Sequence, residues 1–380
     1  MTNKRLVYLD YAAATPLDKT VLAKMTAYFS DNFFNPSAIY KESEIVKADI
    51  EEARARVAYY LGAKPSEIIF TSGATEANNL AIKGIMSNYP DANILVNAIE
   101  HESVLAPATK YNHQIIQVQP DGRVDLNNLK KLINSKTVLI SVMQANNEVG
   151  VIQPIKEIAT IIKNERLKRG LKGLPIYLHS DSTQAANYLD LHVSRLGVDL
   201  MSLNGGKIYG PKQTGALYIK TGVNLSPIIT GGGQERNLRS GTENVSGIIG
   251  FSHALHLVQN NKDKESKRLS ILRDKLIKDL ESNIPNVIIN GSLKHRLPNN
   301  IHITIPKCDN ERLIMSLSNE GILVAAGSAC SASKKAPSHV LKAMAKTDEE
   351  ARSSLRITLG RKTNQTDLDR LLSTLLKIIN

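Results

Sequence analysis

The fold of this chain is decided by residues 178–218, which read LHSDSTQAANYLDLHVSRLGVDLMSLNGGKIYGPKQTGALY. Short apolar segments of strand length alternate here with small and polar residues, and we predict strands at 176–179, 199–203 and 215–219. Asp181 comes just after the first strand, and Lys207 comes just after the second. Because ligands bind beyond the carboxyl ends of strands in open α/β sheets, both side chains are expected at one site.

Lys207 and Asp181 together indicate a particular cofactor. Lys207 follows Gly205 and Gly206, and a lysine among small residues can present its amine to a carbonyl without obstruction. An upstream carboxylate suits a protonated pyridine nitrogen, so the pair points to pyridoxal phosphate. Taken singly, Lys207 also reads as a surface cation and Asp181 as a capping residue, so the interpretation depends on the surrounding sequence.

Strands and helices alternate through most of the chain. Further strands are predicted at 68–70, 93–97, 114–118 and 137–142, and helices at 126–133 and 155–171. This pattern favours an α/β fold with a largely parallel sheet covered by helices.

The character of the sequence changes near residue 257. A charged amphipathic helix is predicted at 257–284, followed by strands of a smaller α+β lobe at 301–305, 322–326 and 354–358. We therefore expect a large cofactor-binding domain at 15–256 and a small domain formed by 1–14 with 257–380.

Composition argues against several classes of protein. The formal net charge is +12, but Lys and Arg are scattered and only 4% of residues are aromatic, so we expect a solvated basic surface and no direct nucleic-acid partner. No apolar run approaches the roughly 20 residues of a membrane span. The N-terminus becomes strand-like almost at once, which leaves no room for a targeting segment, and two cysteines cannot make a disulfide framework. We expect a cytoplasmic protein.

A small-residue turn at 71–76, TSGATE, joins a strand to a helix. Free backbone N–H groups and the helix dipole would make this turn an anion cradle. An ordinary capped helix explains the same residues, so the motif alone decides nothing.

Cys330 lies in a run of small residues at 326–333, AGSACSAS, which predicts a loop that can move. Lys334 and Lys335 follow and would favour the thiolate. Cys308 has no comparable setting, and we assign it a structural role.

Twelve motifs in order carry a resemblance over nearly the whole chain. They are YLDYAAATP, FNPSAIY, FTSGATEANNLAI, IEHESVL, NNEVGVIQPI, HSDSTQA, KIYGPKQTGALY, GGGQER, RSGTEN, LPNN, GSACSAS and SSLRITLGR. The chain resembles the NifS/IscS-like cysteine desulfurases, which belong to the class V aminotransferase-like group of pyridoxal phosphate enzymes. The resemblance implies the fold type I of pyridoxal phosphate-dependent transferases, with a large mixed, mostly parallel sheet domain and a smaller α+β domain.

The resemblance assigns residues to the cofactor ring. Lys207 would form the Schiff base, and Asp181 would keep the ring nitrogen protonated. Gln184 and Asn147 would hydrogen-bond the phenolic oxygen. His101 would stack on the ring and help to transfer protons.

Other residues are assigned by the same resemblance to the phosphate and the substrate. Thr75 and the amide of Ala74 would bind the phosphate, which Thr242 would reach from the partner subunit of a homodimer. Arg356 would pair with the substrate carboxylate, where a guanidinium fork suits the geometry, and Asn35 would assist it.

The implied reaction converts L-cysteine to L-alanine and leaves the sulfur as a persulfide on Cys330. An acceptor protein, either an iron–sulfur scaffold or a tRNA-thiolation protein, would then take the sulfur. Two alternatives stay open: a related pyridoxal phosphate enzyme, such as a selenocysteine lyase or an aminotransferase, and a catalytically weakened binding partner.

Several positions depart from the family pattern. Asn204 and Gly206 stand where a Ser and a His usually bind phosphate, although the Asn204 amide can still donate. Tyr40, Asn237 and 187–188 also differ from the usual residues. We therefore predict that pyridoxal phosphate binds, but more loosely than in relatives.

Overall fold

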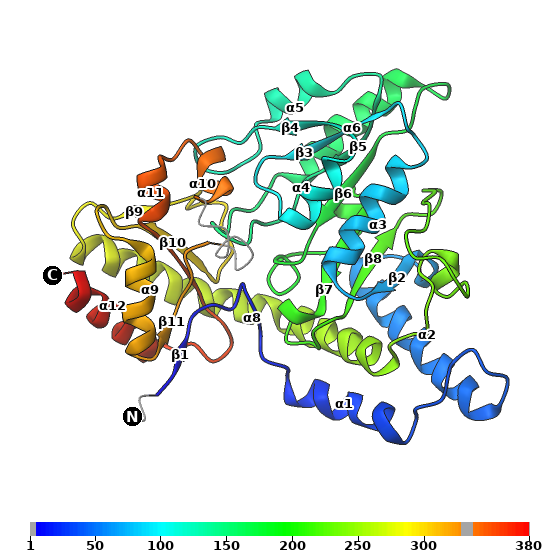
Figure 1. Ribbon diagram of the computed structural model, residues 1–380, viewed down its shortest axis with the longest axis horizontal. Helices are drawn as coiled ribbons and strands as arrows, with labels where there is room; N and C mark the ends of the chain where they lie inside the picture. Colours follow the sequence, from blue (N-terminus) through cyan, green and yellow to red (C-terminus); the bar gives the residue numbers. More distant parts are fainter. Residues whose placement is uncertain (1–4, 328–336, 380) are drawn as a thin grey trace.

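The computed structural model describes residues 5–327 and 337–379 and centres on a seven-stranded sheet (Figure 1). Its strands are β2 (Ile68–Thr71), β3 (Asn93–Asn97), β4 (Asn112–Ile116), β5 (Thr137–Ser141), β6 (Tyr177–Asp181), β7 (Leu200–Asn204) and β8 (Gly215–Ile219). Their order is β2-β8-β7-β6-β5-β3-β4, and all neighbours are parallel except β8, which runs antiparallel to β2 and β7. The predicted mixed, mostly parallel sheet is confirmed.

Helices cover both faces of this sheet, so the side chains of its inner strands are buried on each side, whereas the edge strand β4 is largely exposed. In β3, Ile94 and Val96 pack in one core, and Leu95 between them packs in the other. The first core includes α3 (Ala74–Met86) and α4 (Glu102–Ala108), and the second includes α2 (Lys41–Leu61), α6 (Ile155–Arg169), α7 (Val193–Leu196) and part of α8 (Val245–Asn283). Two further helices are α1 (Lys19–Ser30) and α5 (Leu126–Leu132).

A smaller lobe is built from the C-terminal part of the chain together with its N-terminal strand (Figure 1). Its antiparallel sheet has the order β12-β10-β9, and a second pair joins β1 to β11 in parallel. The strands are β1 (Val7–Tyr8), β9 (Ile288–Ile289), β10 (Asn300–Thr304), β11 (Ile322–Leu323) and β12 (Ser354–Thr358). The helices are α9 (Asn310–Asn319), α10 (His339–Ala343), α11 (Asp348–Arg352) and α12 (Gln365–Ile379).

The long helix α8 begins well before the predicted start at residue 257. Its first residue is Val245, and the Asn244 side chain caps it by accepting from the backbone of Gly247 at 3.1 Å. Small and apolar residues surround Phe251 in this part, which hides the helical period in the sequence but suits burial against the sheet. The predicted domain boundary at 256 stays a prediction, because α8 crosses it as one helix and contributes to the cores of both lobes.

Two predicted strands differ in extent. The strand predicted at 322–326 is only β11, and Ala325 beyond it makes a single bridge to Arg356. The strand predicted at 114–118 lies two residues earlier as β4, because its pairing with β3 sets Asn112 opposite Asn93. Among the described residues, no helix combines the length and apolar character needed to cross a membrane.

A buried ion pair fixes the segment that leads to Thr242. Arg54 on α2 donates to both carboxylate oxygens of Glu235, at 2.8 and 2.9 Å, and the two side chains are 5% and 4% exposed. Glu235 also accepts from the backbone N–H of Phe70 at 2.7 Å. Glu235 and the next two residues have left-handed φ values of 47°, 58° and 65°, a strained run that the ion pair holds in place.

We expect Arg54→Ala to lower the free energy of unfolding by about 3–5 kcal/mol, because it leaves the Glu235 carboxylate buried without its cation. Arg56→Ala is the matched control on the same helix. Its exposed pair with Glu52 predicts a loss below about 1 kcal/mol. Urea unfolding of both variants checks the prediction, and equal losses would contradict it.

Candidate active site

A pocket opens at the carboxyl ends of β6 and β7. The pocket brings together nine predicted site residues: Ala74, Thr75, His101, Asn147, Asp181, Gln184, Asn204, Lys207 and Arg356. The loops that follow the strands of the sheet therefore converge as the sequence predicted.

Asp181 is the last residue of β6, and its side chain is held by two neutral donors. Asn78 donates to Oδ2 at 2.8 Å, and the backbone N–H of Thr183 donates to Oδ1 at 2.9 Å. Asn78 is fully buried on α3 and also donates to the Ser103 hydroxyl at 2.8 Å. The sequence analysis missed Asn78, although an asparagine at a core-facing helix position was a usable signal.

Lys207 ends a short 3₁₀ turn, Gly205–Lys207, directly after β7. Its Nζ donates to the carbonyl of Ala13, and its own carbonyl accepts from the Asn187 amide at 2.6 Å. Gly205 is required here, since a Cβ would lie 2.1 Å from the Thr214 hydroxyl. The hydrogen bond to Ala13, in the N-terminal segment, holds the Lys207 amine at the pocket.

His101 caps the first turn of α4 through its ring. Nδ1 accepts from the backbone N–H of Ser103 at 3.1 Å and lies 2.9 Å from its hydroxyl. Burial lowers the pKa of His101 below its usual value; the Lys207 cation adds to this shift, while Asp181 opposes it. A neutral ring with Nδ1 engaged leaves Nε2 to exchange a proton.

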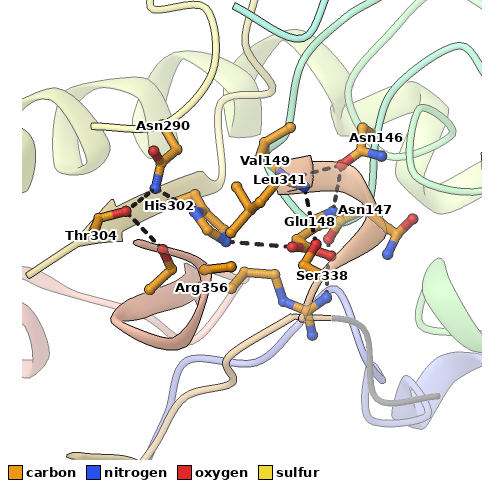
Figure 2. Close-up of polar contacts among 12 residues, drawn as sticks. Asn146, Asn147, Glu148, Val149, Asn290, His302, Thr304, Ser338, Leu341 and Arg356 are labelled. Atoms are coloured by element: carbon orange, nitrogen blue, oxygen red, sulfur yellow. Dashed lines mark hydrogen bonds and ion pairs between the residues drawn. The ribbon is translucent and has the colours of Figure 1, made fainter. Parts of the chain in front are cut away.

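Arg356 lies in the middle of β12 and is almost fully buried, with 1% of its surface exposed. Nη2 pairs with Asp10 at 2.8 Å, and Nη1 donates to the Asn147 carbonyl at 3.1 Å (Figure 2). Nε has no partner among the described residues. Asp10 was not predicted as a site residue, because it lies in the motif YLDYAAATP, which was interpreted as a strand and the loop after it.

Three predicted residues are not in the pocket of the single chain. Asn35 is exposed in the loop before α2, where its side chain accepts from the Ser37 backbone at 2.9 Å. Thr242 is exposed beside a second pocket. Cys330 lies outside the described residues. Their roles stay predictions.

The residues of the pocket fit pyridoxal phosphate. The Lys207 amine and the Asp181 carboxylate face one cavity, as the aldehyde and the ring nitrogen of that cofactor require. Ala74 and Thr75 form the first turn of α3, whose backbone N–H groups suit a phosphate. Asn204 Oδ1 accepts a hydrogen bond from the backbone N–H of Gly206 at 3.0 Å, so the amide nitrogen of Asn204 is the group left to face the cavity.

Comparison with known proteins agrees with this site. The family described as Aminotransferase class-V matches residues 7–371. The chain belongs to the class V aminotransferase family. One relative, a cysteine desulfurase IscS from Dictyoglomus turgidum, is 44% identical, and the alignment covers 99% of this chain and 95% of the relative.

Solved structures of the same family give the same result. A NifS-like protein superposes with a TM-score of 0.91 at 32% identity, covering 99% of both chains. A structure described as SspA in complex with cysteine has a TM-score of 0.80 at 33% identity, covering 93% of this chain and 98% of the other. The fold is that of the NifS-like, fold type I pyridoxal phosphate enzymes, and the family depends on that cofactor.

We expect Asn78→Ala to weaken pyridoxal phosphate binding by about 10-fold or more, because a hydrogen bond to a charged group contributes about 1.5–3 kcal/mol. Asn88→Ala, just beyond the far end of α3, serves as the control. A fluorescence titration of the apoprotein with cofactor measures both dissociation constants. Unchanged affinity in Asn78→Ala would show that Asp181 needs no such support.

We expect Gly206→His to tighten cofactor binding by at least about fivefold, since one added donor to phosphate contributes about 1–3 kcal/mol. A Cβ at this position has room, because its nearest neighbour, Asn204 Oδ1, would lie 3.5 Å away. The same titration tests this. Equal cofactor affinity in Gly206→His and the parent protein would mean that Gly206 does not weaken cofactor binding.

Proposed function

We propose that this protein is a cysteine desulfurase that converts L-cysteine to L-alanine and carries the sulfur on Cys330. The observation that supports it best is one pocket holding the Lys207 amine, the Asp181 carboxylate and the Arg356 guanidinium. Relatives with 40–44% identity over nearly the whole chain bear the name cysteine desulfurase.

Arg356 would bind the substrate carboxylate. Nη1 and Nη2 each carry a second N–H beyond the bonds to Asn147 and Asp10, and these can donate to a carboxylate. Because Asp10 fixes Nη2, the guanidinium is oriented before substrate arrives, which lowers the entropy lost on binding.

Lys207 and His101 would move protons at the substrate. When bound, pyridoxal phosphate supplies a sink for the electrons released at the substrate Cα. The Lys207 amine can take the Cα proton and return it, and the neutral His101 ring can relay a proton through Nε2.

Cys330 would take the sulfur. Its thiolate forms a sulfur–sulfur bond to the substrate sulfur, and the bond from that sulfur to Cβ breaks. The two sulfur atoms are oxidised and Cβ is reduced, since Cβ keeps the bonding electrons and gains a proton as L-alanine forms. No external oxidant is needed.

The active form would be a homodimer in the cytoplasm. Several large apolar side chains of α1, α2 and their connection are exposed in the single chain: Phe29, Phe33, Ile39 and Ile45. A second subunit would cover such a surface, and exposed Thr242 would reach the partner's phosphate site. The persulfide would pass to an acceptor protein for iron–sulfur cluster assembly or tRNA thiolation.

We expect Cys330→Ser to reduce alanine formation from L-cysteine by at least about 100-fold, because the nucleophile is lost. L-Cysteine should still change the visible absorbance of the bound cofactor, since Lys207 and Arg356 remain. Cys308→Ser is the control and should keep full activity. Full activity in Cys330→Ser would point instead to a selenocysteine lyase or an aminotransferase.

A further inference from the structure

A buried carboxylate and a buried imidazole that have no role in the mechanism above lie beside the pocket. Glu148 follows the pocket residue Asn147, and its side chain is 2% exposed. Its Oε1 lies 3.9 Å from Nε2 of His302, a fully buried residue of β10. Figure 2 shows the two side chains pointing toward each other.

The backbone of Glu148 is fixed to both lobes. The Asn146 side chain accepts from the backbone N–H groups of Glu148 and Val149, at 2.8 and 2.9 Å. The Asn300 amide, from the small lobe, donates to the Glu148 carbonyl at 2.9 Å. The backbone at Glu148 is therefore held in one place.

His302 is oriented by its other ring nitrogen. Nδ1 lies 3.1 Å from the Asn290 amide nitrogen, which can only donate, so in the neutral ring the proton is on Nε2. Nε2 lies 3.9 Å from Glu148 Oε1, which is too far for a hydrogen bond. Burial, with the cations Arg296 and Arg356, lowers the pKa of His302 to about 3, so the ring is neutral.

The carboxylate also meets the chain that leads to Cys330. A Cβ on Gly327 would lie 3.3 Å from Oε2 of Glu148 and 3.4 Å from its Cδ. Two residues earlier, Ala325 exchanges both backbone hydrogen bonds with Arg356, at 3.1 and 2.6 Å. Residues 325–327 thus run between the substrate-binding arginine and Glu148.

We propose that Glu148 is a positioning residue that fixes residues 325–327 beside Arg356 and so sets the rate of sulfur transfer to Cys330. This inference rests on the proposed function, in which Cys330 receives the sulfur. Glu148 touches neither substrate nor cofactor, and the bonds made and broken are those described above.

The main test compares Glu148→Ala and Glu148→Gln in the cofactor-loaded protein. In a single turnover, Glu148→Ala should form persulfide and alanine at least about 10-fold more slowly, and Glu148→Gln should recover part of that loss. KM for L-cysteine and the absorbance change on adding it should stay within about twofold, since the pocket is untouched. Unchanged transfer, or an equal loss of substrate binding, would overturn the proposal.

A second measurement needs no activity. Backbone hydrogen exchange within 322–327 should become faster in Glu148→Ala, with or without L-cysteine. Glu100→Ala is the matched control: Glu100 is a fully buried glutamate that is likewise adjacent in sequence to a pocket residue, His101, but it accepts from the backbone N–H of Met143. Unchanged exchange in Glu148→Ala would overturn the proposal even if the protein had no desulfurase activity.

A milder variant guards against misfolding. Gly327→Ala places a methyl against the carboxylate and should slow transfer in the parent protein. The same change should cost little in the Glu148→Ala background, where the methyl has space, so the two effects should not add. Additive effects would show that Glu148 does not act on Gly327. Failure of the parent protein to release alanine would sink the proposed function and leave the exchange test to decide this one.

Discussion

The site depends on one negative charge held at the end of the central strand β6. Asp181 carries that charge in a nearly closed setting, where an unsupported carboxylate would be costly. Asn78 from α3 and the backbone of Thr183 support it, so the helix on one face of the sheet and the turn after β6 are both tied to the same side chain. Lys207 follows the neighbouring strand β7 at the same edge of the sheet, so its amine and the Asp181 carboxylate can act on one cofactor.

The two lobes meet at this edge through backbone and buried polar groups. Arg356 reaches from the small lobe to the Asn147 carbonyl, and Asn300 reaches to the Glu148 carbonyl. The loop after β5 therefore joins the large sheet to the small one. Arg356, which we propose binds the substrate, is thus in contact with both lobes.

Most of this arrangement could be predicted from the sequence, and the exceptions have physical reasons. Strand β8 could be predicted from its apolar segment. The turn at Lys207 could be predicted from its glycines, of which Gly205 leaves no space for a Cβ. The early start of α8 could not be predicted in the same way, because its first turns are chosen by burial against the sheet. Asp10 was missed because its partner Arg356 lies 346 residues away, which no local pattern records. The core-facing position of Asn78 was a local signal of a buried polar role, but its partner Asp181, 103 residues away, could not be read from the same pattern.

The placement of the first strand has a consequence for synthesis. Asp10 and the carbonyl of Ala13 are made first, yet their partners Arg356 and Lys207 emerge 346 and 194 positions later. A nascent chain that has exposed Lys207 still lacks Arg356, the residue that we propose binds the substrate carboxylate. On that proposal, the growing polypeptide cannot bind free cysteine at this site until translation is nearly complete.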